Sequence, residues 1–296
     1  MARPIYAGAE QVIVRLESGE HVCVDPNSID AIDYLLGWPM EMHVLPVFRR
    51  FLTPESVVLD IGANFGLYTA AAASFVRRSG RLYAFEANPH TFKFLQRTLY
   101  ANRLFHNPNI VAVNALVGEA SGRGTLYYSP ERLGGATVIN LGQFGAEGRS
   151  VEVERIAVDD FLPPDLPVDL VKIDVEGHEP YVLRGMRQTI GRSPHIRIFL
   201  EFFEGFLAHT IGADRFAAEI AEAGLHLCEV RPGGRIRRIE RGEPVRGAHF
   251  CFLTRTPEAD IAHARRQSRR LRVRLATALR RAGARWDRWR HALYRL

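Results

Sequence analysis

The strongest constraint on the fold is an alternation of short apolar runs and longer amphipathic runs that begins at residue 56. The apolar runs have the length of buried strands, and the longer runs between them have helical spacing. Strands that alternate with helices indicate a parallel sheet covered on both faces. The predicted strands are 57–61, 81–86, 110–113, 168–174, 196–201, 225–230 and 248–254, and the predicted helices are 67–78, 89–104, 179–190 and 213–223.

Three segments depart from this alternation. Residues 11–24 contain two alternating runs around a glycine-containing turn and predict a hairpin, and residues 29–52 show an interrupted helical pattern. In residues 118–158 glycines separate three β-rich runs, which predicts an inserted β segment. The last two predicted strands are joined without a helix, which favours an antiparallel edge strand. We therefore predict a doubly wound α/β domain over 56–254, preceded by a hairpin and helical cover over 1–55 and followed by a tail over 255–296.

Composition excludes several classes of protein. With 47% hydrophobic and 24% charged residues over 296 positions, the chain is neither disordered nor a disulfide scaffold. Its net charge of +6 hints at an anionic partner, but residues 255–296 carry 13 Arg and 3 acidic residues, a net of +10, which leaves −4 in residues 1–254. Because the body is mildly acidic and contains no recognisable DNA or RNA module, we expect no nucleic-acid partner.

The basic tail has the periodicity of an amphipathic helix. Arginines fill the faces that the apolar residues leave, so the tail could lie on an anionic membrane or pack against a protein partner. A solvated terminal extension explains the same composition, and the sequence does not decide between these interpretations. The apolar positions recur at three- and four-residue steps: Leu271, Leu275, Ala278, Ala282, Trp286, Trp289 and Leu293.

Cysteine usage and hydropathy bear on the compartment. Cys23, Cys228 and Cys251 lie far apart and form no C-x-x-C pair, which indicates a reducing compartment. Residues 1–14 lack the basic flank and continuous apolar stretch of a signal peptide. The longest uncharged run, 61–76, is shorter than the roughly 18–20 residues of a membrane-spanning helix. We therefore expect a cytoplasmic protein, peripheral to a membrane if the tail binds one.

Polar residues follow the predicted strands at the end of the sheet where open parallel sheets bind ligands. The first strand runs into Asp60-Ile61-Gly62-Ala63-Asn64-Phe65-Gly66, where glycines allow a sharp turn and a close approach to a ligand. Glu86 ends the second strand and is placed to accept hydrogen bonds from ribose hydroxyls. Asn64 departs from the G-x-G-x-x-G dinucleotide motif, and the Gly-Lys-Ser/Thr of a Walker A loop is absent. The sequence thus predicts a nucleoside site of another type.

The D-x-G-x-x-x-G run resembles the S-adenosylmethionine loop of class I methyltransferases. The strand at 168–174 leads into Lys172-Ile173-Asp174-Val175-Glu176-Gly177-His178-Glu179, and Phe85-Glu86-Ala87-Asn88-Pro89 lies between the two runs. Together they are similar to the D-I-G-A-N-x-G, F-E-P-N-P and K-I-D-V-E-G-x-E motifs of the FkbM family of S-adenosylmethionine-dependent methyltransferases. The resemblance covers about residues 57–203 and departs mainly at Ala87, which affects loop stiffness more than ligand chemistry.

The resemblance implies an S-adenosylmethionine pocket and an O-methyltransferase. Members of the family mostly methylate hydroxyl groups of sugars and polyketide natural products, so we expect a small-molecule or glycan acceptor: a sugar, a glycolipid or a polyketide-type product. Glu86 would hold the ribose, Asn114 would border the adenine, and Asp174 and Glu176 would face the methyl sulfonium or the acceptor. The residues implied to shape the methionine side of the pocket are Asp60, Gly62, Asn64 and Gly66.

Transfer to a hydroxyl requires a base or a metal that activates the oxygen. His178 is the first candidate base because its ordinary pKa, roughly 6.5, suits proton abstraction near neutrality. The alternative is that His178 merely opens the following helix. Asp174, Glu176 and Glu201 form a competing proposal, because carboxylate oxygens from adjacent strand ends could hold Mg²⁺. For Glu201 we favour an orienting or substrate-binding role over metal ligation.

The acceptor side of the site and the type of reaction each allow more than one interpretation. Trp38, Glu41 and His43 could line the acceptor side, although tryptophan at helical spacing is more often part of a core. Asp159-Asp160 is interpreted as a helix cap ahead of the proline pair that follows. The same cofactor motif would serve N-methylation or transfer to a peptide. The chain could also be a non-catalytic cofactor-binding adaptor that docks through its tail, although the charged strand end at 174–178 favours an active enzyme.

Overall fold

The computed structural model describes residues 3–35, 43–76, 79–140, 142–231, 233–240, 242–245 and 248–268. The chain divides into two compact units, residues 1–255 and residues 256–296. In the second unit residues 257–268 are helical, and the apolar tail positions from Leu271 onward lie outside the described residues, as do Trp38 and Glu41. Among the described residues no helix is both long enough and apolar enough to span a membrane.

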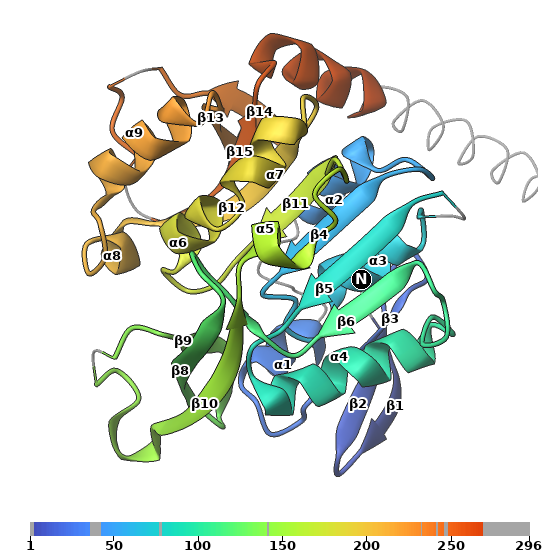
Figure 1. Cartoon of the computed structure of the whole chain (residues 1–296). Helices are drawn as coiled ribbons and strands as arrows, with labels where there is room; N and C mark the ends of the chain where they lie inside the picture. Colours follow the sequence, from blue (N-terminus) through green and yellow to red (C-terminus); the bar gives the residue numbers. More distant parts are fainter. Residues whose placement is uncertain are drawn as a thin grey trace, which may run out of the picture. The chain divides into compact units, whose positions relative to one another are not determined.

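The first unit is built around a mixed eight-stranded sheet with the order β14-β13-β15-β12-β11-β4-β5-β6 (Figure 1). Five neighbouring strands of this sheet, in the order β12-β11-β4-β5-β6, pair in parallel. The chain runs outward from β4 to β6 and later adds β11 and β12 on the other side of β4, so the strand order reverses between β4 and β11. The strands are β4 (Val57–Ile61), β5 (Arg81–Phe85), β6 (Ile110–Val113), β11 (Leu170–Ile173), β12 (Arg197–Phe203), β13 (His226–Arg231), β14 (Arg235–Arg238) and β15 (Ala248–Thr254).

The sheet has the predicted antiparallel edge, but the strand over 248–254 does not form it. β15 pairs antiparallel with both β12 and β13 and lies inside the sheet, and the edge is β14, a strand that the sequence pattern does not predict. Cys251, Phe252 and Leu253 of β15 are fully buried, as a strand covered on both faces requires. β14 reads Arg-Ile-Arg-Arg, and charged side chains protect an edge strand from further pairing.

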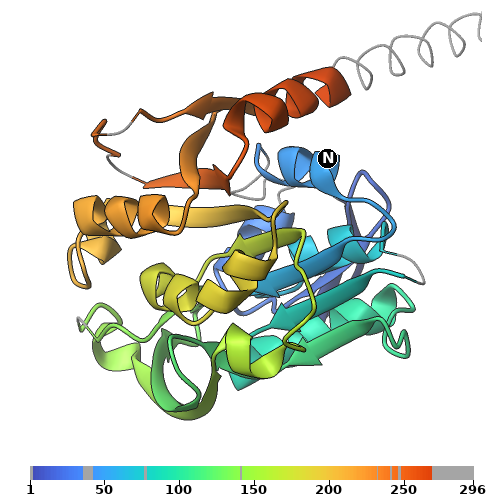
Figure 2. The ribbon, with the colours of Figure 1, turned by 45° about the horizontal axis from the view of Figure 1, so that its top comes forward.

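Helices cover both faces of this sheet (Figures 1 and 2). Ile198 and Leu200 of β12 point into a core shared with α5, α6, α7 and α9, whereas Phe199 between them points to the opposite face. There the Phe199 ring contacts Phe48 of α2, with centroids 5.5 Å apart. The helices are α2 (Leu45–Phe48), η1 (Arg49–Phe51), α3 (Leu67–Ala73), α4 (Pro89–Ala101), α5 (Val158–Phe161), α6 (Glu179–Arg184), α7 (Arg187–Arg192), α8 (Glu204–Leu207) and α9 (Ala213–Glu222).

The helix predicted over 179–190 is two helices in the structure, α6 and α7, with Gly185 and Met186 between them. A Cβ at Gly185 would lie 2.0 Å from the carbonyl oxygen of Gly118, so the chain passes there too closely for a side chain. The cap predicted at Asp159-Asp160 also acts on a different helix. The Asp159 carboxylate accepts hydrogen bonds from the backbone amides of Gln188 (2.9 Å) and Thr189 (2.8 Å), and it thus caps the first turn of α7.

The N-terminal residues form a three-stranded sheet with the order β1-β2-β3. Antiparallel pairing of β2 with β3 confirms the predicted hairpin, and β1 is an additional strand. The sheet is fastened to α4: the Cys23 amide donates to Thr98 Oγ1 (2.9 Å), and the His21 amide donates to Asn102 Oδ1 (2.9 Å). The elements of this region are β1 (Arg3–Gly8), β2 (Gln11–Arg15), β3 (His21–Val24) and α1 (Asp30–Leu35).

A second small sheet, with the order β7-β10-β8-β9, arises from the segment after β6. Glycines that the sequence pattern places between strands lie inside them, such as Gly124 in β8 and Gly134 in β9. A Cβ at Gly134 would lie 3.2 Å from both Asn64 Nδ2 and Asp30 Cγ, so glycine lets β9 approach α1 and the loop after β4. The elements are β7 (Leu116–Val117), β8 (Gly122–Ser129), β9 (Arg132–Thr137), η2 (Gly145–Glu147) and β10 (Arg149–Ile156).

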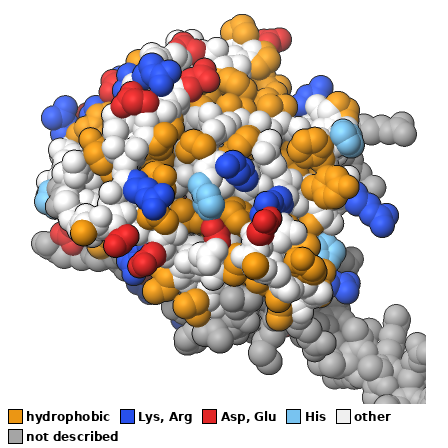
Figure 3. Space-filling model, turned by 90° about the horizontal axis from the view of Figure 1, so that it is seen from below, with side chains coloured by type: hydrophobic (Ala, Val, Ile, Leu, Met, Phe, Trp, Pro, Cys, Tyr) orange, Lys and Arg blue, Asp and Glu red, His pale blue; other side chains and the backbone are white. Residues whose placement is uncertain are grey.

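The surface of the first unit carries charged side chains of both signs. On the face shown in Figure 3, acidic and basic side chains are scattered among hydrophobic ones. Several charges form pairs, including Arg184 with Glu219 (2.7 Å) and Arg237 with Glu243 (2.7 Å). The concentration of arginine noted in the sequence therefore belongs to the tail and not to this face.

Candidate functional site

The loop after β4 turns so sharply that only glycine fits at position 62. Gly62 has a φ of +73°, and a Cβ there would lie 1.8 Å from the carbonyl oxygen of Asp174 at the end of β11. The amides of Gly62 and Ala63 both donate to the carbonyl oxygen of Phe85, at 3.0 and 2.9 Å. The loop thus joins the carboxyl ends of β4, β5 and β11 at the point where the strand order reverses.

Glu86 follows β5 directly and is 7% exposed. Its Oε2 accepts a hydrogen bond from the Asn64 amide (2.8 Å), and its Oε1 accepts one from the Asn88 amide (2.9 Å). Burial raises the pKa of Glu86 to about 7, although both hydrogen bonds act to lower it. Because a carboxylate offers about four acceptor positions, Glu86 keeps the capacity to bind hydroxyl groups.

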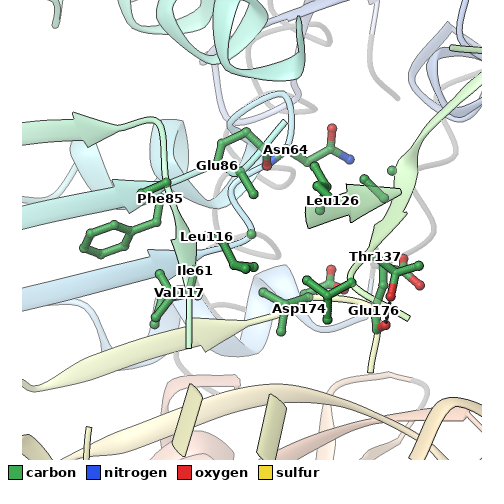
Figure 4. A pocket seen from close by; sticks show the side chains of 17 residues that line it. Ile61, Asn64, Phe85, Glu86, Leu116, Val117, Leu126, Thr137, Asp174 and Glu176 are labelled. Carbon is green, nitrogen blue, oxygen red and sulfur yellow. Dashed lines mark hydrogen bonds between the residues drawn. The ribbon is translucent and has the colours of Figure 1, made fainter. Parts of the chain in front are cut away.

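These residues line a cavity beyond the carboxyl ends of β4, β5 and β11 (Figure 4). Its empty volume, which includes space open to solvent, is about 570 Å³. In Figure 4 Asn64 and Glu86 lie beside one another, and Asp174, Glu176 and Thr137 gather at the other end. The remaining lining is mostly apolar and includes Ile61, Phe85, Ala87, Ala115, Leu116, Val117, Leu126, Ala136, Val138 and Val175.

Three carboxylates predicted from the sequence come together at the end of β11 and on β12. Asp174, Glu176 and Glu201 each place one oxygen within 4.8 Å of the others, and the first two line the cavity. Burial, with the neighbouring charges of Asp174 and Glu179, raises the pKa of Glu176 well above its ordinary value. Such a cluster can hold a proton, a cation or a ligand hydroxyl.

The loop that carries Glu176 is tied to the small inserted sheet. Glu176 has a φ of +53°, a left-handed conformation that non-glycine residues seldom adopt. Thr137 Oγ1, at the end of β9, donates a hydrogen bond of 2.8 Å to the Glu176 carbonyl oxygen. The inserted sheet therefore helps to position a carboxylate of the main sheet.

His178 lies outside the lining of this cavity. Its ring stacks on Tyr181, with centroids 4.7 Å apart, and its side chain is 9% exposed. Neither ring nitrogen has a hydrogen-bond partner among the described residues. Burial and the charge of Arg155 lower the pKa of His178 to about 4. A general base must reach the proton that it removes, so this geometry favours the carboxylates over His178.

Three residues predicted to contact the cofactor support the cavity from outside its lining. Asp60 is fully buried and accepts a hydrogen bond from Thr69 Oγ1 (2.5 Å). The Asn114 side chain donates to the carbonyl oxygen of Glu86 (2.8 Å) and so holds the loop after β5. Gly66, with a φ of +92°, precedes the first turn of α3. His43, a candidate for the acceptor side, is partly buried before α2 and also lies outside the lining.

Sequence reasoning misses several residues of the site. Leu116, Leu126 and Thr137 line the cavity from the inserted segment, whose β-rich pattern is visible in the sequence but whose folding back onto the main sheet is not. Lys172, inside the K-I-D-V-E-G run, is 3% exposed and contacts the loop after β4. A lysine within an apolar strand is itself an unusual signal, since lysines are almost never fully buried unless they are paired.

Comparisons with known proteins identify a family and distant relatives of this chain. The model of a family described as the methyltransferase FkbM domain matches residues 60–222. The hexuronic acid methyltransferase AglP of Haloferax volcanii is 25% identical over 155 residues, which cover 51% of this chain and 58% of that protein. Methyltransferase 1 of Beauveria bassiana is 29% identical over 151 residues, which cover 45% of this chain and 59% of that protein. The matched region thus spans less than two thirds of the length of either relative.

Solved structures with a similar arrangement include two methyltransferases. One is the methyltransferase FkbM of Methylobacillus flagellatus KT, with 15% identity and a TM-score of 0.42, covering 78% of this chain and 55% of that chain. The other is an O-methyltransferase of Bacillus cereus, with 12% identity and a TM-score of 0.41, covering 73% of this chain and 81% of that chain. The family model covers more than half of the present sequence, from Asp60 in β4 to the end of α9. The chain therefore belongs to the FkbM family of S-adenosylmethionine-dependent methyltransferases.

Proposed function

We propose that this methyltransferase transfers the methyl group to a hydroxyl of a sugar, a glycolipid or a polyketide-type natural product. The observation that carries the proposal is one cavity with Glu86 at one end and Asp174 with Glu176 at the other. Glu86 suits the ribose hydroxyls of a nucleoside, and the carboxylate pair suits the activation of an acceptor hydroxyl. The name of the relative from Haloferax volcanii, a hexuronic acid methyltransferase, supports a sugar acceptor.

The residues around the cavity fit S-adenosylmethionine. Glu86 would accept hydrogen bonds from the ribose, and the apolar side chains of Leu116 and Leu126 would contact the adenine ring. Gly62 and Asn64 line the cavity from the loop after β4, where they would border the methionine part of the cofactor. When bound, S-adenosylmethionine supplies a methyl carbon on a positively charged sulfur. The Asp174 carboxylate would offset that charge.

Catalysis would rest on placing the acceptor oxygen in line with the methyl carbon and on removing its proton. We assign the removal to Glu176, which lines the cavity and whose raised pKa makes its ionised form a stronger base than an ordinary carboxylate. The positive charge on the sulfur of the bound cofactor would favour that ionised form. The acceptor hydroxyl would give its proton to Glu176 as its oxygen bonds to the methyl carbon and the bond from that carbon to sulfur breaks, with the electron pair left on sulfur.

A divalent cation is the second candidate for activating the hydroxyl. The oxygens of Asp174, Glu176 and Glu201 lie within 4.8 Å of one another, and carboxylate oxygens are preferred ligands of Mg²⁺. The ammonium of Lys172, 3.3 Å from Asp174 Oδ2, opposes a further cation at this place. We therefore favour transfer without a metal, with Glu201 as an orienting carboxylate. If turnover is lost in EDTA and restored by Mg²⁺, activation by a divalent cation becomes the favoured mechanism.

The basic tail is assigned a separate role in docking. Residues 255–296 carry a net charge of +10, which would attract an anionic membrane or an acidic protein partner. We expect the full chain to bind vesicles that contain anionic lipid, and a chain ending at residue 254 to lose this binding while still binding S-adenosylhomocysteine. Equal vesicle binding by the two chains would contradict membrane docking.

The acceptor class is tested by methyl transfer to a panel of glycosylated, polyketide, amine and peptide acceptors, followed by mass spectrometric location of the added group. We expect a methyl group on an oxygen. Methylation of nitrogen would favour an amine or peptide acceptor, which would use the same cofactor residues. Transfer confined to acceptors without a sugar or polyketide hydroxyl would contradict the proposal. A chain that binds the cofactor and transfers to none of the panel would support a non-catalytic, cofactor-binding role.

A further inference from the structure

We propose that Lys172 is a positioning residue of the cofactor site, which holds the loop after β4 and the acidic end of β11 in a fixed relation. Lys172 lies on β11 and is 3% exposed. Its Nζ donates a hydrogen bond of 2.6 Å to the carbonyl oxygen of Gly62 and lies 3.3 Å from Asp174 Oδ2. The inference rests on the proposed cofactor site, because both partners line that cavity.

The burial of this ammonium is compensated by polar and charged partners. Taking a charged amine out of water is strongly unfavourable unless charged or polar groups replace the water. Besides Gly62 and Asp174, Lys172 Nζ has Asp60 Oδ1 at 4.0 Å and the centroid of the Tyr68 ring at 5.5 Å. Lys172 and Asp60 stand opposite each other in the parallel pairing of β11 with β4, so the sheet itself brings the pair together.

Lysine is rare in this sequence, so its presence at position 172 is a distinctive feature. Of 39 basic residues only Lys93 and Lys172 are lysines, and all the others are arginines. An ammonium is compact and donates in three directions from one atom, whereas a guanidinium is planar and larger. A buried point surrounded by a carbonyl oxygen and two carboxylates suits the ammonium. Lys93 lies exposed on α4 and offers a matched control.

Both cavity-lining partners of Lys172 depend on it for their orientation. The Gly62 peptide lies close to the end of β11, since a Cβ there would lie 1.8 Å from the Asp174 carbonyl oxygen. Without the ammonium, the Gly62 carbonyl oxygen would lose its hydrogen bond and the Asp174 carboxylate its ion pair, so both would be held less firmly. Lys172 does not itself line the cavity, so it acts on the cofactor through Gly62 and Asp174.

The test compares Lys172→Met, the double variant Asp60→Asn with Lys172→Met, and the control Lys93→Met in the full chain. The double variant removes one buried charge of each sign, so we expect it to unfold cooperatively close to the wild type. Calorimetry with S-adenosylhomocysteine should show both Lys172 variants binding about tenfold more weakly or worse, and Lys93→Met binding like the wild type. Hydrogen–deuterium exchange should be faster only in the loops after β4 and β11.

Each contrary outcome contradicts a defined part of this account. Wild-type affinity in the double variant would overturn the proposal, because charge balance alone would then explain Lys172. Faster exchange throughout β12, β13 and β15, or the absence of a cooperative unfolding transition in the double variant, would overturn it in favour of general support of the sheet. Failure of the wild type to bind S-adenosylhomocysteine would instead contradict the proposed cofactor site.

Discussion

The Glu179 carboxylate holds the backbone on both sides of Glu176. Its Oε1 accepts hydrogen bonds from the amides of Val175 (3.0 Å) and Gly177 (3.3 Å), and its side chain is 2% exposed. Between these two amides Glu176 has a φ of +53°. A sparsely populated backbone conformation persists only where its surroundings hold it, and here a buried side chain from the first turn of α6 does so.

Glu179→Ala should therefore impair catalysis more than cofactor binding. Two buried amides lose their acceptor, which costs about 1–3 kcal/mol of stability for each group, and the loop with Glu176 can relax. We expect kcat to fall about tenfold or more, with the affinity for S-adenosylhomocysteine within about threefold of the wild type. Steady-state kinetics and calorimetry measure the two quantities. Glu179→Gln keeps an acceptor oxygen, and an equal loss of kcat in that variant would contradict the positioning role.

Gly62→Ala tests the close approach of the loop after β4 to β11. The added Cβ would lie 1.8 Å from the Asp174 carbonyl oxygen, at a φ of +73°, so the loop must move. We expect a loss of at least about 2 kcal/mol of stability and of cofactor binding. Gly191→Ala in α7 is the control, since among the described residues no atom outside its own helix and chain neighbours lies within 4 Å of its Cβ position, and alanine favours a helix. Similar melting temperatures for the two variants would show that the approach is not as close as described.

Glu86 makes part of the stability dependent on pH. Burial raises its pKa from the ordinary 4.5 to about 7 in the folded chain, so between these values the folded chain keeps a proton that the unfolded chain has released. This contribution is complete below pH 4.5 and is lost as the pH rises through about 7. Glu86→Gln does not titrate. The melting temperature of the wild type, relative to that of Glu86→Gln, should fall between about pH 5 and about pH 8. A difference that does not change with pH would contradict the buried position of this carboxyl.

Glu176→Gln and His178→Ala separate the two candidate bases. Glu176 lines the cavity, whereas the His178 ring packs on Tyr181 outside the lining. We expect Glu176→Gln to lower kcat by about 100-fold or more, within the usual contribution of a general base, and His178→Ala to change it by less than about threefold. Both variants should bind S-adenosylhomocysteine. The reverse order of the two effects on kcat would restore His178 as the base.

The sequence predicts the main sheet well because its signals are local. The apolar run over β4, the glycine at position 62 and the acidic residue at 86 each follow from strand length, turn geometry or ligand chemistry. The resemblance to the FkbM family adds roles for Asp174 and Glu176, and the structure brings both to the cavity.

The predictions that are wrong or incomplete depend on long-range packing. The order β14-β13-β15 at one end of the sheet depends on pairing between strands that are not consecutive in the chain. No local pattern contains this information, so the sequence does not predict β14 or the interior place of β15. Asp159 caps α7, which lies about 30 residues further along the chain. The residue type makes His178 a candidate base, which stays a prediction, and the sequence does not show that His178 lies next to Gly118 and Tyr181.

The most direct test of the proposed site is a calorimetric titration of the wild type and of Glu86→Ala with S-adenosylhomocysteine. The wild type should bind one molecule per chain. Glu86→Ala should bind about tenfold more weakly or worse while unfolding cooperatively, because the acceptor for the ribose hydroxyls is gone. No binding to the wild type, or equal affinity in the two proteins, would contradict the assignment of the cavity between β4, β5 and β11 as the cofactor site.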